Sequence, residues 1–271
     1  MADADALRES GVGGRPVTPD PGPLPPPTAA PGDETVMSLI DHLGELRSRL
    51  FRAILAVAVF SVVGFYASDT IVKLLADAIP GDSPLYFTGL GDAFVIKVKI
   101  SVVVGIILAM PVLLYQGWAF ISPGLTPSER HTARPWIPVA LFFFALGTFI
   151  AWIVLPFAAQ FLVSFSTTDL QPLITAGSYF DFVTTLFLVF GLVMEFPILL
   201  VGLSRVGIVT SQRLSSSRRM VILGIAVFSA VATPGGDLVS PFVLGGTMYL
   251  LYELTVLFIK RTDLVDAFLK R

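Results

Sequence analysis

Residues 135–168 read PWIPVALFFFALGTFIAWIVLPFAAQFLVSFSTT and contain no charged side chain. A helix needs about 20 apolar residues to cross a hydrocarbon core that is about 30 Å thick. This stretch is therefore long enough for one transmembrane helix and part of a connecting loop. It decides the fold class, because the rest of the chain repeats the same pattern.

Five further apolar runs lie on either side of it, at 53–68, 100–128, 182–204, 220–236 and 238–259. Only 14% of the chain is charged and its mean hydropathy is +0.80, whereas a soluble domain carries about 25% charged residues. No run shows the alternation of polar and apolar faces that a soluble core requires. The sequence therefore predicts an all-α polytopic membrane protein with six transmembrane helices, of which the fifth and sixth are short.

The ends of the chain differ from this central region. Residues 1–36 hold eight prolines and no aromatic residue, a composition that favours a disordered tail. We expect a membrane domain at 37–261 and a short C-terminal tail at 262–271. Of the 18 Lys and Arg residues, two lie in the first tail. Thirteen flank the predicted helices on the side of both termini, and Lys73, Lys97 and Lys99 lie on the other. This bias predicts that both termini are cytoplasmic.

The net charge of −2 and the absence of cysteine exclude several classes of function. A globally basic nucleic-acid-binding protein would carry a positive charge. Disulfides, thiol catalysis and metal sites with cysteine ligands need cysteine. The sequence also contains no HExxH, GxSxG, Walker A or GxGxxG motif. We therefore expect no cofactor, no metal site and no catalytic residue.

The first candidate site is the segment HLGELRSRL at 42–50, just before the first apolar run. In a helix, Glu45 and Arg49 form an i,i+4 pair, and the leucines share one face. The structural interpretation is an amphipathic interfacial helix with arginines that extend toward water. The functional interpretation is that Glu45 offers a carboxylate to a cationic ligand at the inner surface.

The second candidate is the cytoplasmic segment YQGWAFISPGL at 115–125, followed by Glu129 and Arg130. Aromatic residues at this position are ordinary membrane-interface anchors. Glu129 is nonetheless a second acid in a basic inner surface. Two separated carboxylates suit the binding of two guanidinium groups, because each can accept a bidentate pair of hydrogen bonds.

Three more acids lie in or between the predicted helices. Glu195 falls near the middle of the membrane, where an acid costs about 2.5–3.5 kcal/mol and indicates a functional site. Pro197 predicts a kink beside it. For Glu253, near the inner end of the sixth helix, a structural and a functional role are equally favoured. Asp237, in a short external turn, is typical of a turn residue or helix cap.

Taken in order, these motifs resemble the TatC family, the multispanning core of the twin-arginine protein translocase. The resemblance covers residues 37–261 and rests on the segments at 42–50 and 115–130, on Glu195-Phe196-Pro197, and on Thr233-Pro234 with Asp237. Gly235-Gly236 before Asp237, and Pro241, depart from the family's usual pattern and leave a specific role for Asp237 undetermined.

The resemblance implies a receptor for the paired arginines of export signal peptides on folded cargo, in the bacterial cytoplasmic (inner) membrane. Glu45 and Glu129 would bind the arginines. Five residues would frame them: Leu46, Arg47, Arg49, Phe120 and Arg130. Glu195 would contact a partner helix. The implied partners are the single-span TatA and TatB subunits and other copies of the chain, and the implied energy source is the proton-motive force. The alternative is a proton-coupled secondary transporter of a small solute with Glu195 as proton carrier.

Overall fold

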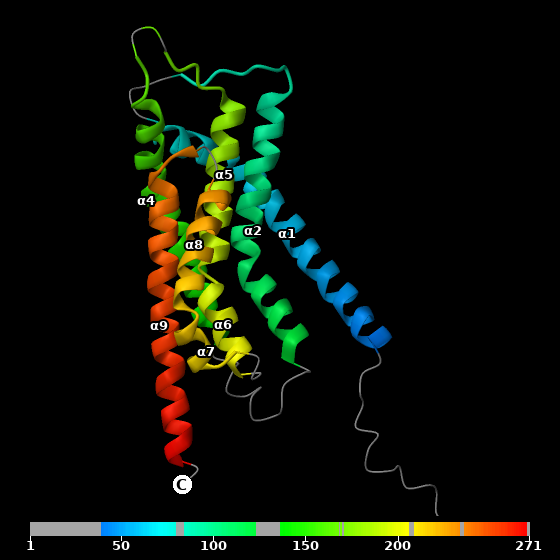
Figure 1. Cartoon of the computed structure of the whole chain (residues 1–271). Coiled ribbons are helices and arrows are strands. Elements are labelled where there is room, and N and C mark those ends of the chain that lie inside the picture. The colour runs from blue at the N-terminus through cyan, green and yellow to red at the C-terminus, as the bar shows by residue number, and fades with distance from the viewer. Residues whose placement is uncertain are drawn as a thin grey trace, which may run out of the picture. The chain divides into compact units, whose positions relative to one another are not determined.

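The computed structural model describes residues 39–79, 84–122, 136–167, 169, 171–205, 209–233 and 236–269, with side chains described only between 43 and 261. Within these ranges the chain is helical, and its one β feature is an isolated parallel bridge between Tyr86 and Thr175. The helices are α1 (Leu39–Ala76), α2 (Asp92–Ile121), α4 (Trp136–Val163), α5 (Ala176–Val193), α6 (Phe196–Arg205), α7 (Ser211–Ser216), α8 (Arg218–Ala232) and α9 (Val239–Leu269) (Figure 1).

Five helical segments in these ranges are long and apolar enough to cross a membrane: Leu43–Ala76, Asp92–Ile121, Trp136–Val163, Ala176–Ser204 and Val239–Arg261. The all-helical, multispanning class predicted from the sequence is confirmed. α8, the predicted fifth helix, has 15 residues and is about 22 Å long at 1.5 Å per residue, so it is short as predicted. The prediction of a short sixth helix is wrong. α9 runs for 31 residues, because no glycine or proline after Ile259 interrupts it.

Glycines allow the backbones of α4 and α5 to come close together. A Cβ atom added to Gly147 of α4 would lie 2.4 Å from the Phe190 carbonyl oxygen, and one added to Gly191 of α5 would lie 2.7 Å from the Phe144 ring. Small residues at helix crossings give membrane helices the van der Waals contact that holds them together. Around this crossing, α4 and α5 supply much of the buried core.

α1 crosses α2 in the same manner but is otherwise exposed along much of its length. A Cβ atom on Gly64 would lie 2.7 Å from the Ser101 carbonyl oxygen, and one on Gly105 would overlap Ser61. One turn from the crossing, the Lys97 ammonium lies 2.8 Å from an Asp69 carboxylate oxygen. α1 is therefore attached to the rest of the domain by this close crossing, by the ion pair, and near its end by Leu75, which is buried in the core and accepts a hydrogen bond from the Tyr179 hydroxyl of α5 at 2.5 Å.

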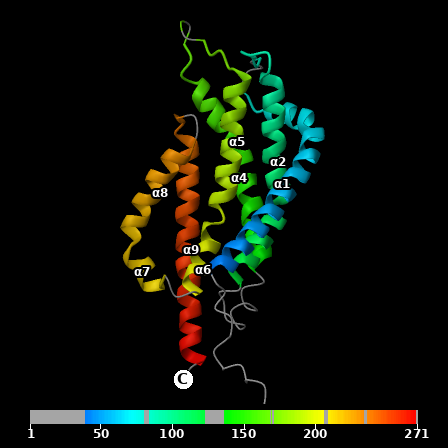
Figure 2. The ribbon, with the colours of Figure 1, turned by 90° about the vertical axis from the view of Figure 1, so that its right-hand side faces the viewer.

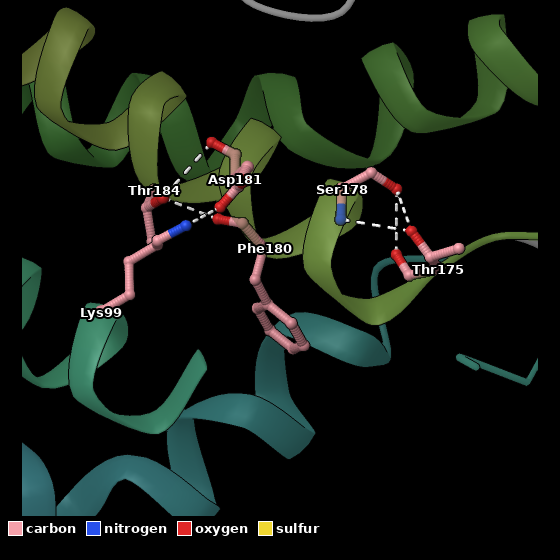
Figure 3. Close-up of polar contacts among 6 residues, drawn as sticks. All are labelled: Lys99, Thr175, Ser178, Phe180, Asp181 and Thr184. Atoms are coloured by element: carbon pink, nitrogen blue, oxygen red, sulfur yellow. Dashed lines mark hydrogen bonds and ion pairs between the residues drawn. The ribbon is translucent and has the colours of Figure 1, made fainter. Parts of the chain in front are cut away.

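The link between α1 and α2 meets the link between α4 and α5. Tyr86 donates its N–H to the Ile174 carbonyl at 3.1 Å, and the Ala176 N–H donates to the Tyr86 carbonyl at 2.8 Å. The Lys99 ammonium also pairs with Asp181 at the start of α5 (Figure 3). The two links therefore lie at one end of the helical domain. We call this the outer end.

Candidate functional site

The opposite end, which we call the inner end, contains the start of α1, the end of α2 and the start of α4 (Figures 1 and 2). This follows from the topology, since each of these helices runs between the two ends. The arginines and the acid predicted to form the first candidate site lie on the first turns of α1. Phe120 lies in the last turn of α2.

Glu45 forms the predicted i,i+4 pair with Arg49. The Arg49 Nε–H donates to Glu45 Oε1 at 2.9 Å, and Arg49 Nη2 contacts the same oxygen. Glu45 Oε2 is buried and has no hydrogen-bond partner among the described residues, and the Glu45 side chain is 18% exposed. One carboxylate oxygen is therefore held by Arg49, and the other still has its capacity to accept a hydrogen bond.

The other predicted residues of this site differ in their exposure, and some lie outside the described part of the chain. Leu46 and Arg47 are exposed on α1, whereas Phe120 is half-buried on α2. Glu129 and Arg130 lie outside the described residues, as does the side chain of His42. The pairing of Glu45 with Glu129 in one site therefore stays a prediction.

Sequence reasoning missed Gln116 as a candidate at the inner end. Its Oε1 atom is buried without a hydrogen-bond partner in the described part of the chain. Gln116 lies one helical turn before Phe120, so both side chains are on one face of α2. An amide that follows a long apolar stretch, in the last turns of α2, is the signal that could have identified it.

Glu195 lies at a break in the fourth apolar run. α5 ends at Val193, α6 begins at Phe196, and the two residues between them form a turn. Pro197 has no N–H to donate, and so interrupts the helix ladder as predicted. The Glu195 carbonyl instead accepts from Ile198 at 3.1 Å and Leu199 at 3.2 Å. The break places an acid at membrane depth without ending the span Ala176–Ser204.

The Glu195 carboxyl group is not engaged by the described residues. Its Oε1 atom is buried and lacks a hydrogen-bond partner among them. Leu192 and Leu199, three residues before and four after Glu195, are 68% and 59% exposed. Residues at these spacings share a helix face, so Glu195 lies beside a face that is open to lipid or to a partner.

Glu253 is engaged by neighbouring side chains. Arg218 Nη2 donates to Glu253 Oε2 at 2.9 Å, and the Tyr249 hydroxyl donates to Oε1 at 3.3 Å. The pair joins the start of α8 to α9, and these two helices form a hairpin (Figure 2). The sequence contains the signal, because Arg218 precedes Gly235 by 17 residues and Glu253 follows Gly236 by 17. The contacts favour the structural role for Glu253.

Asp237 caps α9. The Ser240 N–H donates to Asp237 Oδ1 at 2.6 Å, and the side chain is buried. The interpretation as a helix cap is confirmed. Asp237 Oδ2 is buried without a hydrogen-bond partner among the described residues, which a cap does not require.

The described residues contain no group of three or more His, Asp and Glu side chains that could hold a metal ion. The geometry therefore defines a multi-pass helical membrane protein with one incompletely engaged acid at its inner end and another beside a break within the membrane. A sequence model of the family described as Sec-independent protein translocase protein (TatC) matches residues 41–246. The chain belongs to this family.

Several relatives carry this description. TatC of Azotobacter chroococcum is 36% identical over 236 residues, which cover 85% of this chain and 92% of the relative. TatC of Carboxydothermus hydrogenoformans is 31% identical over 84% of this chain and 95% of its own. TatCy of Bacillus subtilis is 34% identical over 83% and 89%.

Two solved structures have the same fold. A crystal structure of the twin-arginine translocase receptor TatC in DDM is 32% identical, covers 80% of this chain and 99% of its own, and superposes with a TM-score of 0.71. A second crystal structure of that receptor is 33% identical, with a TM-score of 0.70. The chain is thus a subunit of the Sec-independent protein translocase of the twin-arginine system, which favours the translocase over the solute transporter considered above.

Proposed function

We propose that the chain is the signal-peptide receptor of its translocase, and that it acts by binding rather than by catalysis. Glu45 and Glu129 accept hydrogen bonds from the two arginines of a signal peptide on a folded cargo protein. Leu46, Arg47, Arg49, Phe120 and Arg130 surround the bound segment. Each carboxylate–guanidinium pair supplies about 1.5–3 kcal/mol, which corresponds to about 10- to 100-fold in affinity.

The observation that supports this proposal most directly is the state of the Glu45 carboxylate. Arg49 holds one oxygen at 2.9 Å, and the other oxygen is buried without a partner among the described residues. A buried acceptor without a donor is costly, and a guanidinium group from a ligand removes that cost. Arg49 has a second role in this proposal, because its contact with Oε1 directs Oε2 toward the ligand.

We further propose that Glu195 contacts a polar group on the transmembrane helix of a single-span partner, TatA or TatB. Two observations support this role: a Glu195 carboxyl oxygen has no hydrogen-bond partner among the described residues, and the leucines beside it are exposed. Six spans, with α8 as a short fifth one, place both termini in the cytoplasm, with the chain in the bacterial inner membrane. The residues 1–36 and 262–271 are tails of the domain at 37–261. The proton-motive force drives export by the assembled complex, which contains further copies of the chain.

Peptide binding tests the receptor proposal. Full-length chain in nanodiscs is titrated with a fluorescent signal peptide that carries paired arginines, and with a matched peptide that carries paired lysines. Glu45→Gln and Glu129→Gln should each weaken binding of the arginine peptide by about tenfold or more. The lysine peptide should bind weakly to all forms, since lysine lacks the bidentate geometry.

Glu253→Gln is the matched control, because it makes the same chemical change at a carboxylate that Arg218 and Tyr249 already engage. It should leave the affinity for the arginine peptide unchanged. Undiminished binding by the Glu45→Gln/Glu129→Gln double variant would refute the recognition proposal.

A further inference from the structure

An apolar cavity lies between four of the membrane-spanning segments, away from the acids discussed above. Its volume is about 210 Å³, and its walls come from α1, α2, α4 and α5. The side chains that matter for its size and opening are Leu74 of α1, Val104 of α2, Trp152 of α4, and Thr184 and Phe187 of α5. The side chains that line a cavity of this size lose the van der Waals contacts that close packing would give them on that side.

The lining excludes water as the occupant. Thr184 supplies the one hydroxyl in the lining, and it donates to the carbonyl of Phe180 at 2.6 Å in its own helix. Figure 3 shows this hydroxyl turned toward the α5 backbone, beside Asp181. A buried water needs two to four polar partners. The Thr184 hydroxyl is already bonded within its own helix, and the Trp152 indole N–H is a single donor, so the lining does not supply them. An apolar lining of this kind suits a hydrocarbon group.

The depth and the opening of the cavity identify the source of that group. The ion pair between Lys99 and Asp181 lies one residue before Ile100 and two before Val183, both of which line the cavity. The cavity is thus just inside the membrane from a charged layer at the outer end. Leu74 lines the cavity and is 50% exposed, so we take its side of α1 as the mouth of the cavity.

We propose that this cavity binds one acyl chain of a phospholipid from the leaflet at the outer end, with the headgroup at the level of the Lys97–Asp69 and Lys99–Asp181 pairs. Two lysines and two aspartates form that layer, which can contact both the phosphate and the amine of a headgroup. The chain fills the space between α1 and the other helices, and so strengthens the attachment of α1. The proposal requires only that the domain spans a membrane, and it is independent of signal-peptide binding.

Photolabelling tests the occupant directly. The chain is reconstituted in vesicles of phosphatidylethanolamine and phosphatidylglycerol that contain a trace of phospholipid with a diazirine in its acyl chain. After irradiation, labelled residues are mapped by mass spectrometry. Leu74, Val104 and Phe187 should be labelled about fivefold more than Val62 and Phe149, which are exposed residues of the same helical domain. Equal labelling of the two sets would overturn the proposal.

Two variants block the cavity without touching the proposed receptor site. Val104→Phe fills it, and should reduce the labelling of Leu74 and Phe187 by about fivefold while Val62 and Phe149 are unchanged. Val102→Phe is the matched control, since Val102 is on the same helix but is exposed and does not line the cavity. Leu74→Trp closes the mouth from an exposed position and should reduce the labelling of Phe187 in the same way as Val104→Phe. Because it changes no buried side chain, it tests the proposal even where Val104→Phe disturbs the packing of the core.

Thermal unfolding in detergent provides the second measurement. Added phospholipid should raise the Tm of the wild-type chain and of Val102→Phe by about 3 °C. It should raise the Tm of Val104→Phe by less than half of that shift, because the aromatic ring already occupies the space. An equal rise in wild type and Val104→Phe, or pocket labelling that persists in both blocked variants, would overturn the proposal.

Discussion

The region around Glu195 and the hairpin of α8 and α9 both contain a glutamate at membrane depth, but they are held together differently. In the first region, glycines bring α4 and α5 into backbone contact, and Glu195 lies just beyond this crossing with a buried oxygen unengaged by the described residues. In the hairpin, Glu253 itself joins the helices through Arg218. One acid is thus part of the structural attachment and the other is not.

The comparison shows that an acid in a membrane helix is a functional signal only when the fold leaves it without a partner. Charged groups are costly in a membrane, and pairing within the protein lowers that cost. The partnered Glu253 needs no ligand to account for it. Glu195 meets a partner only in the proposal above, and its helix is packed through α4 and α5 without it. Variants at four positions, Gly147, Glu195, Arg218 and Asp237, separate these two roles.

The largest effect is expected where packing alone holds the helices. Gly147→Leu should lower the free energy of unfolding by about 3 kcal/mol, because a Cβ atom there would already lie 2.4 Å from the Phe190 carbonyl oxygen. Denaturant titration in detergent measures the loss. Gly202→Leu on α6 is the control, since that glycine has no atom within 4 Å of the position of a Cβ. Equal losses in both variants would contradict the crossing as the main attachment.

Glu195→Ala should separate function from stability. A polar contact between membrane helices contributes about 1–2 kcal/mol, so crosslinking to a single-span partner, and export, should fall by about tenfold. The midpoint of unfolding and the affinity for the signal peptide should stay unchanged, because described residues do not engage the carboxyl group. Glu195→Gln distinguishes hydrogen bonding from charge. Loss of folded protein in Glu195→Ala would instead assign Glu195 a structural role.

Arg218→Gln should convert Glu253 into a second unpaired acid. Both side chains are partly exposed, so we expect a loss of about 1 kcal/mol in unfolding free energy. The Arg218→Gln/Glu253→Gln double variant should recover most of this loss, and the double-mutant cycle gives the coupling between the two residues. Arg219→Gln, a change at the adjacent exposed arginine, should have no effect. A coupling energy of zero would show that the ion pair does not stabilise the hairpin.

Sequence reasoning identified the features that depend on local composition. Uncharged runs indicated the membrane helices, Pro197 indicated the break beside Glu195, and the spacing of Glu45 and Arg49 indicated their pair. It missed what depends on the register between helices. The approach of Gly147 to Phe190 requires knowledge of how α4 faces α5. The length of α9 was underestimated because hydropathy marks where a membrane ends and not where a helix ends.

The pairing of Glu253 was within reach of the sequence. In an antiparallel hairpin with a tight turn, residues at equal distances from the turn lie side by side, and Arg218 and Glu253 satisfy this condition. Glu129 remains a prediction in the proposed receptor site, since it lies outside the described residues. The peptide-binding experiment therefore tests whether both carboxylates belong to that site.

Asp237 is intermediate between the two glutamates. One oxygen caps α9 through the Ser240 N–H at 2.6 Å, and the other is buried without a partner among the described residues. Asp237→Ala should cost about 1 kcal/mol of unfolding free energy, as loss of a helix cap does. Asp237→Asn keeps the acceptor and should retain both stability and export if capping is the whole role. Normal stability with lost export in Asp237→Asn would place Asp237 with Glu195, as an acid whose free oxygen serves a partner.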